Sequence, residues 1–473
     1  MPPKLTLFDK IWNRHAVHQL SDGRALIHVD RHVLQETTSW HAFDALRDRG
    51  LGVRNPGLTH AVIDHSVATH AGRTVDSFPP TRDMILAMRR HCEEFGLRLY
   101  DIDSDRQGIV HVISPELGIA LPGTTFVCAD SHTATSGGLG AWAWGIGTTQ
   151  VLHVLAAQML LLRKPRTMRV TFNGTPGPGI FAKDLILHLI GRQGVAAGTG
   201  HVVEYAGPAI RALPIEGRLT VCNMSIEFGA RAGLIAADDA TFQYLAGREF
   251  APKGAMWDAA LADWRQLPSD NGAVFDQEIE IDCAAIAPRI TWGNSPQDVI
   301  GIDEQIPAPD SFADADRRAM AERALRYMDL TPGEPMAGTP IDVAFIGSCT
   351  NARLSDLQEA ASVARGRKVA PGVRALVVPG STAVKREAEA IGLDRIFRDA
   401  GFEWRESACS MCVAANGDMV QPGKRSISTT NRNFEGRQGP DSRTHLASPA
   451  MVAAAAVTGR ITDVRRLLNQ GAA

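Results

Sequence analysis

The chain has 473 residues, of which 44% are apolar and 21% charged, and its formal net charge is −3 at pH 7. This composition is typical of a globular protein with an ample core. The small net charge argues against nucleic acid as a partner, and the apolar run at 451–457 is too short to cross a bilayer.

The N-terminus and the cysteine count predict a cytoplasmic protein. The first ten residues lack the apolar core of a secretory signal. Seven cysteines is an odd number, which makes a framework of structural disulfides improbable. We interpret Cys92, Cys128, Cys222 and Cys283, which have apolar neighbours, as small buried hydrophobic residues.

Short β-rich runs alternate with helical patterns along the chain, which predicts an α/β fold with largely parallel sheets. We expect strands at 59–63, 125–128, 168–172, 219–222, 343–346, 375–378 and 426–429. We expect helices at 80–95, 148–162, 182–190, 314–327, 354–365 and 384–391. A basic break at 163–166 and a Pro- and Asp-rich stretch at 304–340 predict three α/β domains, at 1–165, 166–303 and 304–473.

Polar side chains follow five of these predicted strands. In open α/β sheets, ligands bind outside the carboxyl ends of the strands, so we expect these side chains to share a cleft. They are Asp64 and His65, Asp130 and His132, Asn223 with Glu227 one turn later, Cys349, and Asn431 with Arg432 and Arg437.

Two of these groups place a carboxylate beside an imidazole, in Asp64-His65 and in Asp130-x-His132. A carboxylate orients the ring and raises its pKa, which makes it a usable general acid. Either pair alone is more often a satisfied turn histidine. Two arginines close in sequence suit a dicarboxylic acid, because each guanidinium grips a carboxylate with two parallel hydrogen bonds.

Three cysteines have a spacing that favours an iron–sulfur cluster. Cys349 lies on a Gly-Ser turn, and a Cys409-x-x-Cys412 pair follows 60 positions later (409 − 349). Electron-transfer clusters take four cysteines, so three would leave one iron of a cubane open to substrate. An open iron, an imidazole acid and two arginines together fit reversible loss of water from a hydroxy-dicarboxylic acid. These residues include no base for the C–H proton.

The motifs RQGIVH at 106–111, DSHT at 130–133, IGSCTN at 346–351, CSMC at 409–412 and NRNFEGR at 431–437 resemble the aconitase superfamily. The resemblance is greatest to the large subunits of its isopropylmalate dehydratase branch and runs from residue 30 to residue 459. It implies three α/β domains around one [4Fe-4S] cluster and interconversion of 2- and 3-isopropylmalate in leucine biosynthesis.

The resemblance also implies roles for individual residues. The cluster ligands would be Cys349, Cys409 and Cys412. The catalytic residues would be Asp64, His65, His111, Asp130, His132 and Glu227, and the substrate-binding residues Asn223, Arg432, Arg437 and His41. A separate small subunit would add a swivelling domain with the serine base and a further arginine, so we expect this chain to be inactive without it.

Four motifs depart from the family pattern. His41 stands where Gln is usual, Ala408 where Gly is usual before the paired cysteines, and Gln150 where Glu is common. Ser66-Val67-Ala68 replaces the usual Asn-Val-Ser. These departures leave open a paralogue that acts on another malate, such as 2-methylmalate or a homoaconitase-type substrate.

Other interpretations stay open at this level. The three cysteines and a histidine could form a structural zinc site, although such sites draw on compact pairs of ligands. The Cys409-x-x-Cys412 pair alone could serve thiol redox chemistry. The glycine-rich stretch at 137–147 lacks a nucleotide-binding fingerprint, so we expect it to serve close packing of the backbone.

Overall fold

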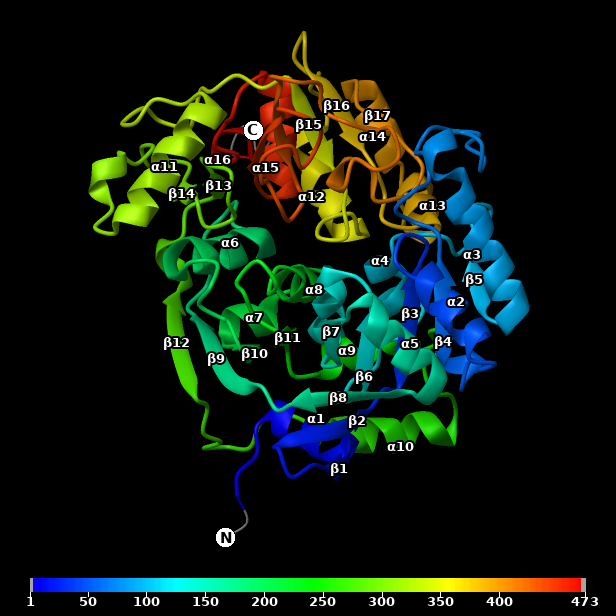
Figure 1. Cartoon of the computed structure of the whole chain (residues 1–473). Helices are drawn as coiled ribbons and strands as arrows, with labels where there is room; N and C mark the ends of the chain where they lie inside the picture. The colour runs from blue at the N-terminus through cyan, green and yellow to red at the C-terminus, as the bar shows by residue number, and fades with distance from the viewer. Residues whose placement is uncertain (1–2, 469–473) are drawn as a thin grey trace. The chain divides into compact units, whose positions relative to one another are not determined.

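The computed structural model describes residues 3–468, which fall into two compact units (Figure 1). Unit 1 comprises the chain up to residue 67 together with 74–173 and 196–281. Unit 2 comprises 68–73, 174–195 and the chain from residue 282 onward. The three-domain division stays a prediction.

The main sheet of unit 1 has five parallel strands in the order β5-β4-β3-β6-β7, coloured blue to cyan in Figure 1. They are β3 (Arg31–Gln35), β4 (Thr59–Val62), β5 (Arg98–Tyr100), β6 (Thr125–Cys128) and β7 (Trp142–Gly145). Strands β4 and β6 are buried at every position, as expected for a parallel sheet covered on both faces. Because the strands are parallel, their carboxyl ends lie along one edge.

Unit 1 contains two further sheets. One has the order β11-β10-β9-β12, with β9 (Arg166–Asn173), β10 (His201–Ala206), β11 (Ala232–Leu234) and β12 (Gln277–Asp282). The other is antiparallel and joins β1 (Ala16–Gln19), β2 (Arg24–His28) and β8 (Met159–Arg163). The helices of this unit are α1 (Leu7–His15), α2 (Trp40–Asp48), α3 (Arg82–Phe95), α4 (Val110–Glu116), α5 (Thr148–Ala157), α7 (Pro208–Ala212), α8 (Ile215–Asn223), α9 (Asp239–Leu245) and α10 (Ala255–Trp264). Its 3-10 helices are η1 (Pro56–Leu58), η2 (Pro79–Thr81) and η3 (Ser131–Leu139).

Unit 2 is built on a second five-stranded parallel sheet, β17-β16-β15-β18-β19, in the yellow to red part of Figure 1. Its strands are β15 (Val343–Ile346), β16 (Arg374–Val377), β17 (Glu403–Trp404), β18 (Arg425–Ser428) and β19 (Arg443–Leu446), and β13 (Arg289–Thr291) pairs with β14 (Val299–Gly301). Its helices are α6 (Ala182–Gln193), α11 (Ala315–Met328), α12 (Leu354–Ala364), α13 (Thr382–Ala390), α14 (Leu393–Ala400), α15 (Pro449–Thr458) and α16 (Arg465–Leu468), with 3-10 helices η4 (Cys283–Ala285), η5 (Pro309–Ser311) and η6 (Ser410–Cys412).

Most of the elements expected from the sequence are confirmed. The α/β class and the largely parallel sheets are present, and six of the seven expected strands form close to their expected bounds. Between residues 3 and 468, no helix has the length and apolarity that a bilayer crossing requires.

The predicted helix at 148–162 is half wrong. Helix α5 ends at Ala157, Gln158 adopts a left-handed conformation with φ of 55°, and the chain continues as strand β8. The run Met159-Leu160-Leu161-Leu162 has good helix formers, but it pairs with β2 and alternates between buried and less buried positions. Pairing with a distant strand overrides the local propensity.

The predicted strand at 219–222 is wrong, because these residues belong to α8. Their run Leu-Thr-Val-Cys is apolar and partly β-branched, which favours a strand locally. Eight of the nine residues of α8 are buried, so the helix has no polar face to reveal a 3.6-residue period.

The glycine-rich stretch serves close packing of the backbone, as expected. A Cβ atom on Gly137 would lie 1.8 Å from the carbonyl oxygen of Gly233, and one on Gly138 would lie 2.8 Å from the backbone nitrogen of Leu219. Segment η3 therefore rests directly on β11 and α8, because neither residue has a side chain.

Gly137→Ala should destabilise unit 1 by at least about 3 kcal/mol, because the new methyl group meets backbone that cannot rotate away. Urea unfolding followed by circular dichroism measures the change. Gly147→Ala is the matched control, because a Cβ there meets nothing within 4 Å, and it should stay within about 1 kcal/mol of the native chain. Equal stability of the two variants would contradict the packing argument.

Candidate active site

A cluster of histidines and carboxylates lies at the carboxyl edge of the main sheet of unit 1. Asp64 and His65 follow β4, Asp130 follows β6, and His111 lies in the first turn of α4. Asp64 is fully buried, and its two carboxylate oxygens are engaged by His65 Nδ1 at 2.6 Å and by the backbone N–H of Val110 at 2.8 Å. The second contact sets this carboxylate at the N-terminus of α4, where the helix dipole favours negative charge.

Asp130 is the centre of this cluster. Its Oδ1 lies 2.6 Å from Nε2 of His111 and accepts the backbone N–H of His132 at 2.8 Å, and its Oδ2 lies 3.4 Å from Nε2 of His65. Burial by itself would raise the pKa of Asp130, but the charge and hydrogen bond of His111, joined by those of His65, hold its pKa well below the usual range. Asp130 is therefore an anion that orients two imidazoles.

A second imidazole–carboxylate pair lies beside the first. His132 Nε2 is 2.9 Å from Oε1 of Glu227, and Asn223 donates to the hydroxyl of Thr135 at 2.8 Å. Asn223 and Glu227 are predicted from the sequence to follow a strand. Asn223 is instead the last residue of helix α8, and Glu227 lies in the turn that follows this helix. All four side chains are buried.

Glu36 is a buried carboxylate that the sequence analysis missed. It follows β3 directly, and its carboxylate accepts the backbone N–H groups of Asp64, His65 and Ser66 at 3.3, 2.9 and 2.6 Å. The strand-end rule would have found it if the run at 31–35 had been identified as a strand.

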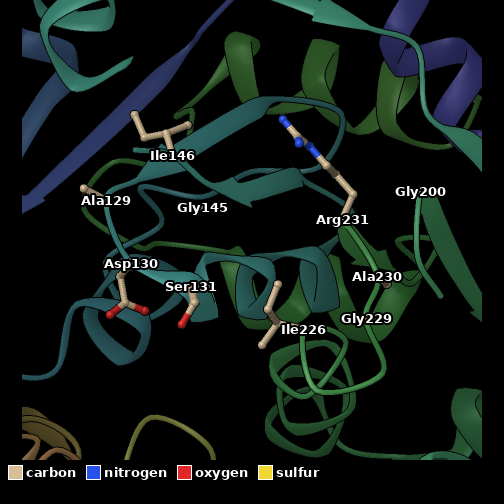
Figure 2. Close-up of a pocket in the computed structure, with 10 residues that line it drawn as sticks. All are labelled: Ala129, Asp130, Ser131, Gly145, Ile146, Gly200, Ile226, Gly229, Ala230 and Arg231. Carbon is tan, nitrogen blue, oxygen red and sulfur yellow. The ribbon is translucent and has the colours of Figure 1, made fainter. Parts of the chain in front are cut away.

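A cavity of about 530 Å³ in unit 1 borders this cluster. Figure 2 shows Asp130 and Ser131 at one end of it, with apolar walls from Ile146 and Ile226, and the guanidinium of Arg231 at the other end.

In unit 2 the three predicted cluster cysteines lie on two loops and are buried. Cys349 follows β15. Cys409 directly precedes the short helix η6, and Cys412 is the last residue of that helix. Ser348 and Ser410, each adjacent to a cysteine, have φ of 79° and 50°. Left-handed backbone at a non-glycine residue costs roughly 1–3 kcal/mol and concentrates at functional sites.

Polar groups surround two of the thiols. The side-chain N–H of Asn431 donates to Cys349 Sγ at 3.5 Å, and its oxygen lies 3.9 Å from Cys412 Sγ. The hydroxyl of Ser348 donates to Cys412 Sγ at 3.4 Å, and Nη2 of Arg437 lies 3.9 Å from the same sulfur. N–H and O–H groups of this kind can also donate to a sulfur that binds metal.

The loop that carries the cysteine pair is anchored at several points within unit 2. The carboxylate of Asp418 accepts from Ser410 at 2.8 Å, from Asn416 at 3.2 Å and from Thr69 at 2.6 Å. The buried guanidinium of Arg73 donates to the carbonyl of Ser407 at 2.7 Å. Thr69 and Arg73 belong to the segment 68–73, which follows almost directly after Asp64-His65 in the chain.

Three predicted substrate-binding residues are less buried. Arg432 and Arg437 are half-buried in the loop that follows β18, and the guanidinium of Arg437 lies over the ring of Phe434 at 5.4 Å. His41 is exposed at the start of α2, with its ring stacked on Trp40.

Comparisons with known proteins identify the family of this chain. The family model for the aconitase family (aconitate hydratase) matches residues 9–459. The chain is 58% identical to the 3-isopropylmalate dehydratase large subunit 1 of Bradyrhizobium diazoefficiens, over 98% of this chain and 97% of that protein. The chain belongs to the aconitase family. The holo-form crystal structure of aconitase X from Thermococcus kodakaraensis has a TM-score of 0.46 and 14% identity, with 94% of this chain and 90% of that chain covered.

Membership of the aconitase family confirms the predicted enzyme class, a hydro-lyase, and implies an iron–sulfur cluster. The residues present fit such a cluster, because three buried cysteines lie on strained loops and two of them have hydrogen-bond donors at their sulfurs. The family also disfavours the structural zinc interpretation. The remaining four cysteines are buried, as expected, and burial raises the pKa of Cys92 to about 12 and that of Cys283 to about 11.

Asp130→Asn should lower the free energy of unfolding by about 3 kcal/mol at pH 7, because it breaks a buried charge-assisted network. The folded-state pKa of Asp130 lies below the unfolded value of 3.8, so its stabilising contribution is complete above about pH 4 and is lost at lower pH. The gap between the two proteins in urea unfolding should therefore narrow below pH 4. Asp270→Asn, which alters a half-buried ion pair with Lys10 nearer the surface, should have a much smaller effect at every pH.

Proposed function

We propose that this chain is the large, catalytic subunit of a 3-isopropylmalate dehydratase, which interconverts 2-isopropylmalate and 3-isopropylmalate by removing and re-adding water in leucine biosynthesis. The observation that carries the proposal is the 58% identity, over 98% of the chain, with a protein named as that large subunit. The buried histidines and carboxylates of unit 1 and the three cysteines of unit 2 supply the acid and the metal ligands that such a reaction requires.

The proposed cofactor is one [4Fe-4S] cluster held by Cys349, Cys409 and Cys412. When bound, such a cluster supplies an iron without a protein ligand, which as a Lewis acid weakens the C–O bond of the leaving hydroxyl. Asn431 and Ser348, which donate to the cysteine sulfurs in this structure, would tune the charge on those ligands.

His65 is the proposed general acid. Asp64 accepts from Nδ1 of His65, which leaves Nε2 to carry the proton that the departing oxygen takes. Asp130 and His111 hold the ring from the other side, through the contact of Asp130 with Nε2 of His65. His132 and Glu227 form the second buried pair, and Asn223 supports it from the end of α8.

Arg432 and Arg437 are the proposed anchors for the substrate carboxylates. Both are half-buried, so a carboxylate that binds there loses water and gains two parallel hydrogen bonds from each guanidinium. His41 is a further proposed contact, through its exposed ring at the start of α2.

The proposed partner is a small subunit that supplies a serine as the base for the C–H proton and a further arginine. The described residues around Asp130 offer imidazoles and carboxylates that are already hydrogen-bonded to each other, which leaves the second proton transfer to the partner chain.

Activity of the complex with the small subunit on a panel of substituted malates tests this function. We expect kcat/KM to be highest for isopropylmalate, with little turnover by the large subunit alone. The substitutions at His41 and Ala408 make 2-methylmalate and homoaconitase-type substrates the informative competitors. A higher kcat/KM for one of these would assign the chain to another member of the family.

Cys349→Ser should remove the open-iron cluster and the activity while the chain stays folded. Iron and sulfide content and visible absorbance after anaerobic reconstitution measure the cluster, and circular dichroism measures the fold. Cys283→Ala is the matched control, since Cys283 lies in η4 away from the three ligands, and it should bind iron as the native chain does. Full iron content in Cys349→Ser would show that Cys349 is not a cluster ligand.

A further inference from the structure

Glu36 binds the backbone of the loop that carries the proposed acid. Three consecutive N–H groups, from Asp64, His65 and Ser66, converge on its carboxylate at 3.3, 2.9 and 2.6 Å. Successive N–H groups that point to one side form a concave anion site. In this unit the anion is supplied by the chain itself, from the end of β3, the neighbour of β4 in the sheet.

The placement of Glu36 is energetically unfavourable by itself. Its side chain is buried, with 2% of its surface exposed, and burial together with the nearby charge of Asp64 raises its pKa. Two carboxylates, on Glu36 and Asp64, therefore share one buried region around His65. Buried groups with like charges are concentrated at functional sites, because folding alone rarely favours them.

The loop conformation determines where His65 points. Asp64 is held at one end by the N-terminus of α4 and at the other by Nδ1 of His65. With the backbone of the loop held by Glu36 and Nδ1 held by Asp64, Nε2 of His65 lies 3.4 Å from Oδ2 of Asp130.

We propose that Glu36 is a positioning residue for the reaction, which fixes the Asp64-His65-Ser66 backbone so that His65 presents Nε2 at the reacting centre. The expected effect on the reaction rate rests on the proposed function. The expected effect on the loop rests on the geometry of unit 1 alone. Glu36 acts through the loop and has no contact with substrate in this role.

Glu36→Gln is the sharpest test, because it keeps the size of the side chain but replaces one of two accepting oxygens with an NH2 group. That group must face an N–H donor of the loop, so one hydrogen bond becomes a repulsion. In the complex with the small subunit, we expect kcat to fall at least tenfold while KM changes less than threefold. Glu36→Asp, which keeps both acceptors, should recover part of the kcat.

Glu204→Gln is the matched control. Glu204 is also a buried glutamate of unit 1 whose pKa is raised by burial, but it accepts from Ser269 at 2.6 Å and has no contact with the loop. It should keep the native kcat. An equal loss in Glu204→Gln and Glu36→Gln would show a general effect of buried glutamates and would overturn the proposal.

Amide hydrogen exchange of residues 64–66 in the full-length large subunit, followed by mass spectrometry, separates positioning from overall stability without using activity. Glu36 accepts from the three backbone N–H groups of this segment. Loss of one accepting oxygen releases at least one of them, so exchange at 64–66 should be faster in Glu36→Gln and should keep the native rate in Glu204→Gln.

Native exchange at 64–66 together with a lower melting temperature would overturn the proposal and leave Glu36 a purely structural residue. Native kcat in Glu36→Gln would overturn it as well. If the native complex has no hydro-lyase activity, the proposed function fails, while faster exchange at 64–66 in Glu36→Gln would still support the link between Glu36 and the loop.

Discussion

The shared anion at Asp130 is the interaction on which the arrangement of unit 1 depends. One carboxylate binds His111 from α4 and His65 from the loop after β4, and it also accepts the N–H that begins η3. A buried carboxylate stays charged only where such partners offset its desolvation. Three separate segments meet at this edge of the sheet, and each supplies one of the contacts that offset the desolvation cost of the Asp130 carboxylate.

Two further carboxylates, on Asp64 and Glu36, join the segments next to Asp130 in the same way. Asp64 joins the N-terminus of α4 to His65, and Glu36 joins the end of β3 to the same loop. Segment η3 can follow Asp130 only because Gly137 and Gly138 let its backbone lie directly on β11 and α8. The chemistry at the sheet edge and the close packing beneath it are thus parts of one structure.

In unit 2, hydrogen-bonded loops with left-handed backbone hold the three thiols. Cys349 and the Cys409–Cys412 pair lie on loops with left-handed serines, and Asn431 and Asp418 hold these loops by hydrogen bonds. The strain in the backbone is offset by these contacts, which point the sulfurs toward polar donors. The proposed cluster would therefore bind to thiols whose loops the fold already holds by hydrogen bonds.

The sequence by itself determined the chemical groups, the α/β class and most strand ends, because apolar runs, turn residues and cysteine spacing are local properties. Asp64, His65, Asp130 and His132 could be predicted for that reason. Only the tertiary structure decided that 219–222 is helical, that 159–163 is a strand, and that Glu36 binds the loop of Asp64 and His65. In each of these cases the deciding partner is distant in sequence, and pairing, burial or a backbone hydrogen bond with that partner outweighs the local preference of the residues.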